Sequence, residues 1–188
     1  MKIYKLSTHD KVINIRDPSN FKKNDELLKS LHKTKCKIDS CNLRKWELAK
    51  KFHNDFGYIY TSSNTQKNIC RVLPISRSYF KLLEILNEFN LFEENQSFSC
   101  IAEGPGGFIQ CIHDIYTKKS ININNVYGIT LISEDKKIPY WNVNILKNPK
   151  NNIQYGKDKT GDIYKLQNAL DYIKCHKDKC YLVTSDGG

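Results

Sequence analysis

Apolar residues follow two spacings along the chain, one typical of buried strands and one typical of helices. Short apolar runs with the length of buried strands occupy residues 98–101, 126–131, 153–155 and 181–185. Elsewhere apolar residues recur every three to four positions, which predicts amphipathic helices. These helices are expected at 24–31, 42–54, 76–86, 108–118 and 162–173. The Pro- and Asn-bearing segment 133–152 is expected to be irregular.

The order of these elements predicts the fold. Strands that alternate with helices are typical of an α/β protein with a Rossmann-like, doubly wound parallel sheet. Ligands then bind at the carboxyl ends of the strands. Residues 1–70 are expected to form a basic arm and a helical lead-in, and residues 71–188 the α/β domain.

Composition narrows the class of protein. The chain has 188 residues, 39% of them hydrophobic and 11% aromatic, which is enough for the core of one domain. No apolar run is long enough to span a bilayer, and no signal peptide opens the chain, so no membrane partner is expected. The net charge of +10 favours a nucleic-acid partner, although a lysine-rich surface also serves solubility.

Seven cysteines, an odd number, indicate free thiols in a reducing, intracellular compartment. Two C-x4-C pairs, Cys36/Cys41 and Cys175/Cys180, leave zinc as an alternative. Structural zinc sites usually have tighter paired spacings, so we expect no metal.

A glycine-rich turn from Ala102 to Phe108 joins a predicted strand to a predicted helix. Glycines allow a tight turn and close approach to a ligand, and the helix start presents free N–H groups. The turn is neither G-x-G-x-x-G nor a P-loop. Its acidic residue, Glu103, suits a neutral or cationic ligand better than a pyrophosphate.

Three sequence blocks together resemble FtsJ-like RNA ribose 2′-O-methyltransferases. Residues 76–85 (SRSYFKLLEI) resemble the S-R-A-x-F-K-L-x-E-I segment of that family. Residues 103–108 (EGPGGF) resemble its A-P-G-G-[WF] motif, and residues 184–188 (TSDGG) its strand-end motif. The resemblance covers roughly residues 33–188 and implies a methyltransferase-type sheet that binds S-adenosylmethionine.

The resemblance also implies a catalytic pair. It places the first lysine of the family's Lys-Asp-Lys-Glu tetrad at Lys81 and the aspartate at Asp186. A lysine acts as a base only if burial or a neighbouring cation lowers its pKa from about 10.4. Asp186 would orient Lys81 and stabilise positive charge near the sulfonium. The alternatives are a solvated helix lysine and an ordinary turn aspartate.

The cofactor contacts implied by the resemblance lie mainly in the glycine-rich turn. Glu103 would face the amino group of the methionine part, or would be an exposed turn acid. Cys100 stands where many methyltransferases carry an acid. Asp162 would lie near the adenine and also cap the helix at 162–173. The expected cofactor residues are Glu103, Gly104, Pro105, Gly106, Gly107, Phe108 and Asp162.

RNA contacts are expected beside the catalytic lysine, where Arg77 and Tyr79 would line a groove. Phosphates need cations, and unstacked bases need aromatic faces. The basic residues of the lead-in have two interpretations: they contact RNA, or they form the solvated face of a helix. They are Lys33, Lys35, Lys37, Arg44, Lys45, Lys50 and Lys51.

The Asp-Gly-Gly ending and the motif order resemble the branch that methylates the first transcribed nucleotide of capped mRNA. The implied partners are capped mRNA and other capping or transcription subunits. The implied location is nucleus or cytoplasm, or the viral factory or virion if the source is a virus. An rRNA or tRNA substrate, and a non-catalytic RNA-binding module, remain alternatives.

In the family, further strands carry the second lysine and the glutamate of the tetrad. We expect these groups to lie beyond residue 188, and the segment to be part of a longer polypeptide. We therefore expect weak or no methyl transfer from residues 1–188 alone.

Overall fold

The computed structural model describes residues 24–53, 72–135, 138–177 and 179–187. The predicted basic arm, the loop at 61–68 and Cys70 lie outside these ranges, as does the predicted domain boundary at 70/71. The chain divides into two units, residues 1–47 and 48–188.

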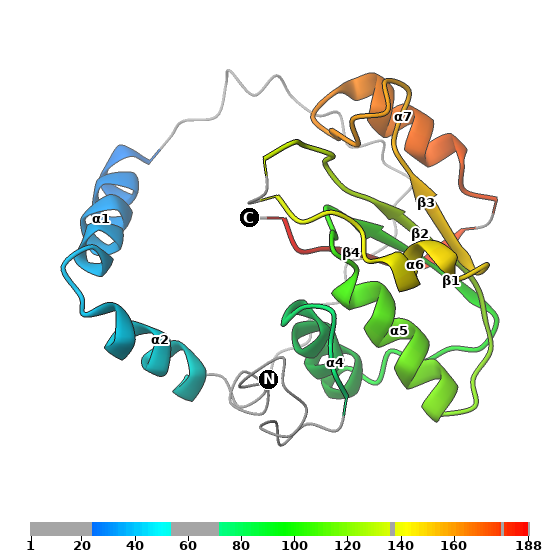
Figure 1. Ribbon diagram of the computed structural model, residues 1–188, viewed down its shortest axis with the longest axis horizontal. Helices are drawn as coiled ribbons and strands as arrows, with labels where there is room; N and C mark the ends of the chain where they lie inside the picture. Colours follow the sequence, from blue (N-terminus) through cyan, green and yellow to red (C-terminus); the bar gives the residue numbers. More distant parts are fainter. Residues whose placement is uncertain (1–23, 54–71, 136–137, 178, 188) are drawn as a thin grey trace. The chain divides into compact units, whose positions relative to one another are not determined.

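The second unit contains a four-stranded sheet whose strands all run parallel (Figure 1). The strands are β1 (Gln96–Ile101), β2 (Ile123–Ile129), β3 (Asn151–Gln154) and β4 (Cys180–Ser185), in the spatial order β3-β2-β1-β4. All four predicted strands are confirmed, with bounds that differ by a few residues.

The strand order creates a switch point at β1. From β1 the chain first moves outward to β2 and β3, and then returns to place β4 on the other side of β1. Residue Ile101, at the carboxyl end of β1, pairs with Ile129 on one side and Ser185 on the other. Crevices at such points are where open α/β sheets bind ligands.

Helices cover both faces of the sheet, so the doubly wound prediction is confirmed (Figure 1). Helices α4 (Ser78–Glu88) and α5 (Gly107–Lys118) share the larger core with Phe98 and Cys100 of β1. Helix α7 (Leu166–Lys174) packs on the opposite face, where Tyr172 joins a smaller core. Successive strand residues point to opposite faces. Accordingly, Ser99 lies between Phe98 and Cys100 in sequence and hydrogen-bonds the Tyr172 hydroxyl at 2.7 Å.

The segment expected to be irregular contains a short helix, α6 (Val143–Lys147). Its first turn is capped by Asn142, whose side chain accepts a hydrogen bond from the Asn144 N–H at 2.9 Å. Trp141 and Ile145 are buried in the larger core. The prediction missed α6 because its five residues are too few to show a helical period.

Helix α7 differs from its prediction in both its start and its inward face. It begins at Leu166, after the extended residue Lys165, so Asp162 is not its N-cap. The Asp162 carboxylate instead accepts a hydrogen bond from the Tyr164 N–H in the preceding loop. Asn168 and Tyr172 are the buried positions of α7. The sequence pattern places Ile163, Leu166, Leu170 and Ile173 on one face. Ile163, before the helix, packs against the smaller core, whereas the other three are exposed.

The first unit and the segment joining it to the second contain α1 (Asp25–Lys35), the 3-10 turn η2 (Cys36–Ile38) and α2 (Leu43–Phe52). Both predicted lead-in helices are therefore confirmed. Asn24 caps α1 by accepting a hydrogen bond from the Leu27 N–H at 3.0 Å. Across the described ranges, no helix has both the length and the apolar character needed to cross a membrane.

Candidate active site

The fold brings Lys81 of α4 beside Asp186, which follows β4. The Lys81 Nζ donates a hydrogen bond to Asp186 Oδ1 at 2.6 Å, although the two residues are 105 positions apart in sequence. Helix α4 positions the lysine, and the end of β4 positions the aspartate at the switch point. The side chains are 57% and 28% exposed, respectively. The described residues therefore leave the Lys81 side chain largely open to solvent.

A cavity of about 360 Å³ opens at the carboxyl ends of the strands. Its wall takes residues from the segments that follow all four strands. These residues are Ala102, Leu131, Gly161, Asp162, Ile163, Tyr164, Ser185 and Gly187. Of the seven predicted cofactor residues, Asp162 lines this cavity, and the glycine-rich turn contributes through the adjacent Ala102. Asp162 therefore lies where a ligand contact was expected; the contact itself stays a prediction.

The glycine-rich turn packs tightly against other parts of the domain. A Cβ atom on Gly106 would meet the Ile145 side chain of α6, and Gly106 also has φ +115°. A Cβ atom on Gly107 would overlap the hydroxyl groups of Ser76 and Ser78 at the start of α4. Close packing between protein elements thus accounts for these two glycines, and their predicted ligand contacts remain predictions.

Ala102 begins the turn in the left-handed region of the backbone, with φ +53°. This conformation is unfavourable for a residue with a Cβ atom, and such residues cluster at functional sites. Its position on the cavity wall places this local strain at the candidate site. The sequence offered no sign of it, because alanine at a strand end is unremarkable in itself.

Glu103 is buried, with only 2% of its surface exposed, so the exposed-acid alternative is wrong. Its Oε1 atom accepts a hydrogen bond from the Phe108 N–H at 2.6 Å and so satisfies one of the free donors of α5. Its Oε2 atom is buried without a hydrogen-bond partner among the described protein atoms. Burial raises the pKa of Glu103 to about 8, against the opposing effect of the Phe108 hydrogen bond, while the Asp186 charge raises it further.

Replacing Glu103 with glutamine is expected to remove a pH-dependent loss of stability. Between pH 4.5 and about 8, the unfolded carboxyl ionises while the folded one keeps its proton, so wild-type stability falls as pH rises. The slope is about 1.4 kcal/mol per pH unit for one proton. Glutamine keeps an acceptor for the Phe108 N–H and carries no titrating group. Urea unfolding of both proteins from pH 5 to 9 measures the difference.

The wild-type and Glu103→Gln unfolding curves should separate progressively, with the variant becoming relatively more stable at high pH. Other titrating groups contribute to both proteins and largely cancel in the comparison. A stability difference that stays constant across this pH range would contradict the buried, proton-binding environment of Glu103.

The two predicted RNA-contact residues have different environments. Arg77 is exposed immediately before α4, so its RNA contact stays a prediction. Tyr79 is only 3% exposed and packs edge-to-face against Phe80, with 5.3 Å between ring centroids. Its hydroxyl also hydrogen-bonds Asp114. Tyr79 therefore cannot present a ring face to an RNA base, because the core occupies that face.

Six cysteines in the described ranges are free thiols, including Cys36, Cys41, Cys175 and Cys180 of the two C-x4-C pairs. Within the same ranges, no cluster of three or more His, Cys, Asp or Glu side chains is arranged to hold a metal ion. Burial raises the pKa of the Cys100 thiol, which occupies the position where an acid was expected.

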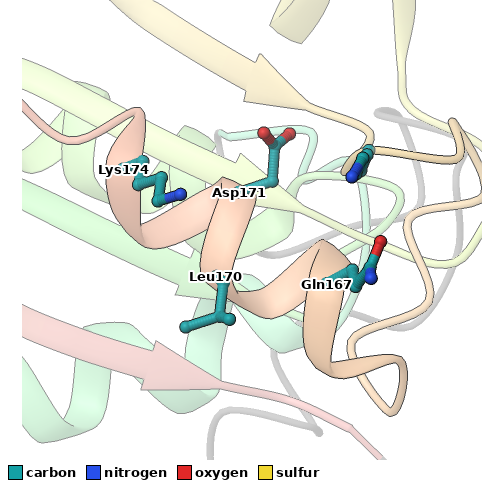
Figure 2. A pocket seen from close by; sticks show the side chains of 5 residues that line it. Gln167, Leu170, Asp171 and Lys174 are labelled. Atoms are coloured by element: carbon teal, nitrogen blue, oxygen red, sulfur yellow. The ribbon is translucent and has the colours of Figure 1, made fainter.

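Another hollow, of about 230 Å³, lies on the outer surface of α7 (Figure 2). Gln167, Leu170, Asp171 and Lys174 line it, together with Lys157. It brings together residues of both charge signs, and its lining comes from α7 apart from Lys157, which follows β3. The cavity at the switch point takes residues from the segments after all four strands, and we therefore take it as the candidate site.

Comparison with known proteins identifies the family of the chain. Residues 74–188 match the family described as FtsJ-like methyltransferase, which is more than half of the chain. A cap-specific mRNA (nucleoside-2′-O-)-methyltransferase 1 from Leishmania braziliensis is 32% identical over 93 residues. That alignment covers 49% of this chain and 23% of the relative, so the chain corresponds to a minor part of that protein.

A crystal structure of a protein described as a ribosomal RNA methyltransferase from Plasmodium falciparum has 25% sequence identity to the chain. The match covers 60% of this chain and 56% of that one, with a TM-score of 0.38. The family assignment rests on the extent of the family match, which includes α4, the glycine-rich turn and β4. The chain belongs to the FtsJ-like methyltransferase family.

Proposed function

We propose that the protein transfers a methyl group from S-adenosylmethionine to a ribose 2′-hydroxyl of RNA, at the first transcribed nucleotide of capped mRNA. The observation that carries this proposal is the Lys81–Asp186 pair, held at 2.6 Å at the switch point of the sheet. A lysine amino group held by a fixed carboxylate, beside a nucleoside-sized cavity, suits reaction at a hydroxyl that has to lose its proton.

The residues around the cavity fit S-adenosylmethionine. A volume of about 360 Å³ lies at the lower end of the range for small-ligand sites. Glu103 does not line this cavity, but its Oε2 is buried without a hydrogen-bond partner among the described atoms. It would accept a hydrogen bond from the cationic amino group once that nearby charge favours ionisation of the carboxyl. Asp162 would accept hydrogen bonds from the nucleoside part, beside the apolar Leu131 and Ile163. When bound, S-adenosylmethionine supplies an electrophilic methyl group on a sulfonium sulfur.

In the proposed reaction, Lys81 and Asp186 handle the proton of the 2′-hydroxyl. The Lys81 Nζ, as a neutral amine, would accept this proton when the 2′-oxygen takes the methyl group. Asp186 holds Nζ in place and stabilises the ammonium that results. Because Lys81 is 57% exposed here, bound RNA has to supply the missing burial.

The RNA partner is supported by charge and by similarity. The chain carries a net charge of +10, and Arg77 is exposed four residues before Lys81. Phosphate contacts by such residues would position the RNA backbone. The similarity to a relative described as cap-specific favours capped mRNA over other RNA substrates.

The test is a methyl-transfer assay of the full-length protein with labelled S-adenosylmethionine and three RNAs: capped, uncapped, and capped with a 2′-O-methyl group already on the first nucleotide. The proposal expects label on the first RNA only. Equal labelling of all three would overturn the cap assignment and leave a methyltransferase with another target. No labelling, together with no calorimetric binding of S-adenosylhomocysteine, would overturn the enzyme assignment itself.

A further inference from the structure

The loop between β3 and α7 carries one wall of the cavity. Asp162, Ile163 and Tyr164 lie in it, and all three line the cavity. Tyr164 is 98% exposed and leaves its ring open to a ligand or to solvent. The position of this wall depends on how residues 156–162 are fixed to the rest of the domain.

One buried side chain from α7 ties this loop together. Asn168 is 1% exposed, and its Oδ1 accepts a hydrogen bond from the Asp158 N–H at 3.1 Å. Its Nδ2 donates to Asp158 Oδ1 at 2.8 Å, to the Asp162 carbonyl at 3.0 Å and to Thr160 Oγ1 at 3.3 Å. A single amide therefore contacts three loop residues, including the main chain of Asp162.

The loop is built around this contact. A Cβ atom on Gly156 would lie 2.6 Å from the Cβ of Asn168, so the main chain passes directly over the amide. Asp158 also accepts hydrogen bonds from the Thr160 N–H at 3.0 Å and from Lys165 Nζ at 2.7 Å. These bonds, first that of Lys165 and then those of Thr160 and Asn168, lower the pKa of Asp158. Asn168 thus contacts a loop whose conformation is also held by the hydrogen bonds of Asp158.

The other side of the loop contacts the segment after β2. The Ile132 N–H donates to the Thr160 carbonyl at 2.7 Å, and the Gly161 N–H donates to the Tyr155 carbonyl at 2.7 Å. The Asn168 amide joins the loop to α7, and the Ile132 hydrogen bond joins it to the segment after β2. Loss of the amide would leave the Asp162 end of the loop without its link to α7.

We propose that Asn168 is a positioning residue that fixes the Asp162–Tyr164 wall of the cavity. The adenine contact expected at Asp162 would then depend on Asn168, and this consequence rests on the function proposed above. Asn168 touches no ligand in this arrangement; it acts through the loop. Buried amides with all their hydrogen-bonding groups used are costly to replace, because each partner then loses its bond.

The test uses Asn168→Asp, which keeps the side-chain shape and the Oδ1 acceptor but removes the Nδ2 donor. It also places a carboxylate against Asp158. The matched control is Gln167→Glu, the same amide-to-acid change on the neighbouring, exposed position of α7 (Figure 2). Thr160→Val is the companion variant, which leaves Asn168 in place and removes one acceptor of its amide. It also removes the hydrogen bonds of the Thr160 hydroxyl to Asp158 Oδ1 and to the Asp162 N–H.

Two measurements separate positioning from general stability. Hydrogen exchange at the amides of residues 156–162 should accelerate about tenfold or more in Asn168→Asp, while strand β1 keeps its protection. Calorimetry should show a loss of about tenfold in affinity for both adenosine and S-adenosylhomocysteine. The Gln167→Glu control should match the wild type in both assays, and Thr160→Val should lie between.

The outcomes keep the two proposals distinct. Unchanged loop exchange in Asn168→Asp and in Thr160→Val would overturn the positioning role. Faster exchange with unchanged adenosine affinity would overturn the dependence of the adenine contact on Asn168. If Asn168→Asp does not fold, Thr160→Val decides by the same criteria. Failure of the wild type to bind either ligand would count against the proposed function, while loop exchange would still test Asn168.

Discussion

Replacing Lys81 with alanine is expected to lower the rate of methyl transfer to RNA by about 100-fold or more, the usual contribution of a positioned acid–base group. The variant lacks the Nζ atom that Asp186 holds at 2.6 Å, so the 2′-hydroxyl would lose its proton acceptor. Single-turnover transfer of a labelled methyl group from S-adenosylmethionine to capped RNA, with the substitution made in the full-length protein, measures this rate.

Binding should distinguish loss of chemistry from loss of fold. Lys81 is exposed, and no part of the described core depends on its side chain, so S-adenosylhomocysteine affinity and the melting temperature should stay close to wild type. Lys118→Ala, at an exposed position in the last turn of α5, is the matched control. A Lys81→Ala rate within a few-fold of the Lys118→Ala rate would remove Lys81 from the chemistry.

The parallel sheet was predictable because β1, β2 and β4 contain short apolar runs between segments with a helical period; in β3, Ile153 is the one apolar residue. Buried parallel strands are apolar on both faces, so their composition marks them without tertiary information. The juxtaposition of Lys81 and Asp186 was predicted by resemblance alone, since nothing in the spacing of two residues 105 positions apart sets a distance. The strand order explains how the two residues meet. Because β4 lies beside β1, Asp186 at the end of β4 comes close to α4, which carries Lys81.

The face of α7 could not be predicted from its apolar residues. Leu166, Leu170 and Ile173 form a regular stripe, yet Asn168 and Tyr172 are the residues that face inward. Both inward side chains carry polar groups that form hydrogen bonds outside α7. Asn168 bonds to the 158–162 loop, and Tyr172 bonds to Ser99. Hydrophobic periodicity assumes that polar residues face solvent, and it fails where a buried hydrogen-bond network replaces apolar packing.

The burial of Glu103 and of Tyr79 also could not be predicted from the local sequence. An acid in a glycine-rich turn is ordinarily exposed, but the start of α5 draws the Glu103 carboxyl inward through the Phe108 N–H. An aromatic residue beside a catalytic lysine suggests a base-stacking surface, but Tyr79 faces α5 and the core. Burial at both positions is set by how α4 and α5 pack, which local sequence does not specify.

Gly161→Ala is expected to destabilise the domain by about 3–5 kcal/mol, at the severe end for single substitutions. An added Cβ would overlap the Thr130 carbonyl oxygen, a main-chain atom that cannot rotate away. Gly161 also has φ +67°, which costs a residue with a Cβ about 1–2 kcal/mol. The remainder would come from displacing the loop from the segment after β2. At about 2–4 °C per kcal/mol, the melting temperature should fall by roughly 10 °C.

Gly187→Ala is the matched control, because it lies on the same cavity wall and its added Cβ would lie 3.3 Å from the Ala102 Cβ. That contact is tight but involves a side-chain atom. We therefore expect the melting temperature of Gly187→Ala to fall by less than about 5 °C, which corresponds to a loss of roughly 1–2 kcal/mol in the free energy of unfolding. Equal melting temperatures for the two variants would contradict the close approach of Gly161 to Thr130. A large loss in Gly161→Ala alone would show that the loop carrying Asp162 is held against the end of β2 by main-chain contact. Only glycine permits that contact, and the cavity wall therefore depends on it.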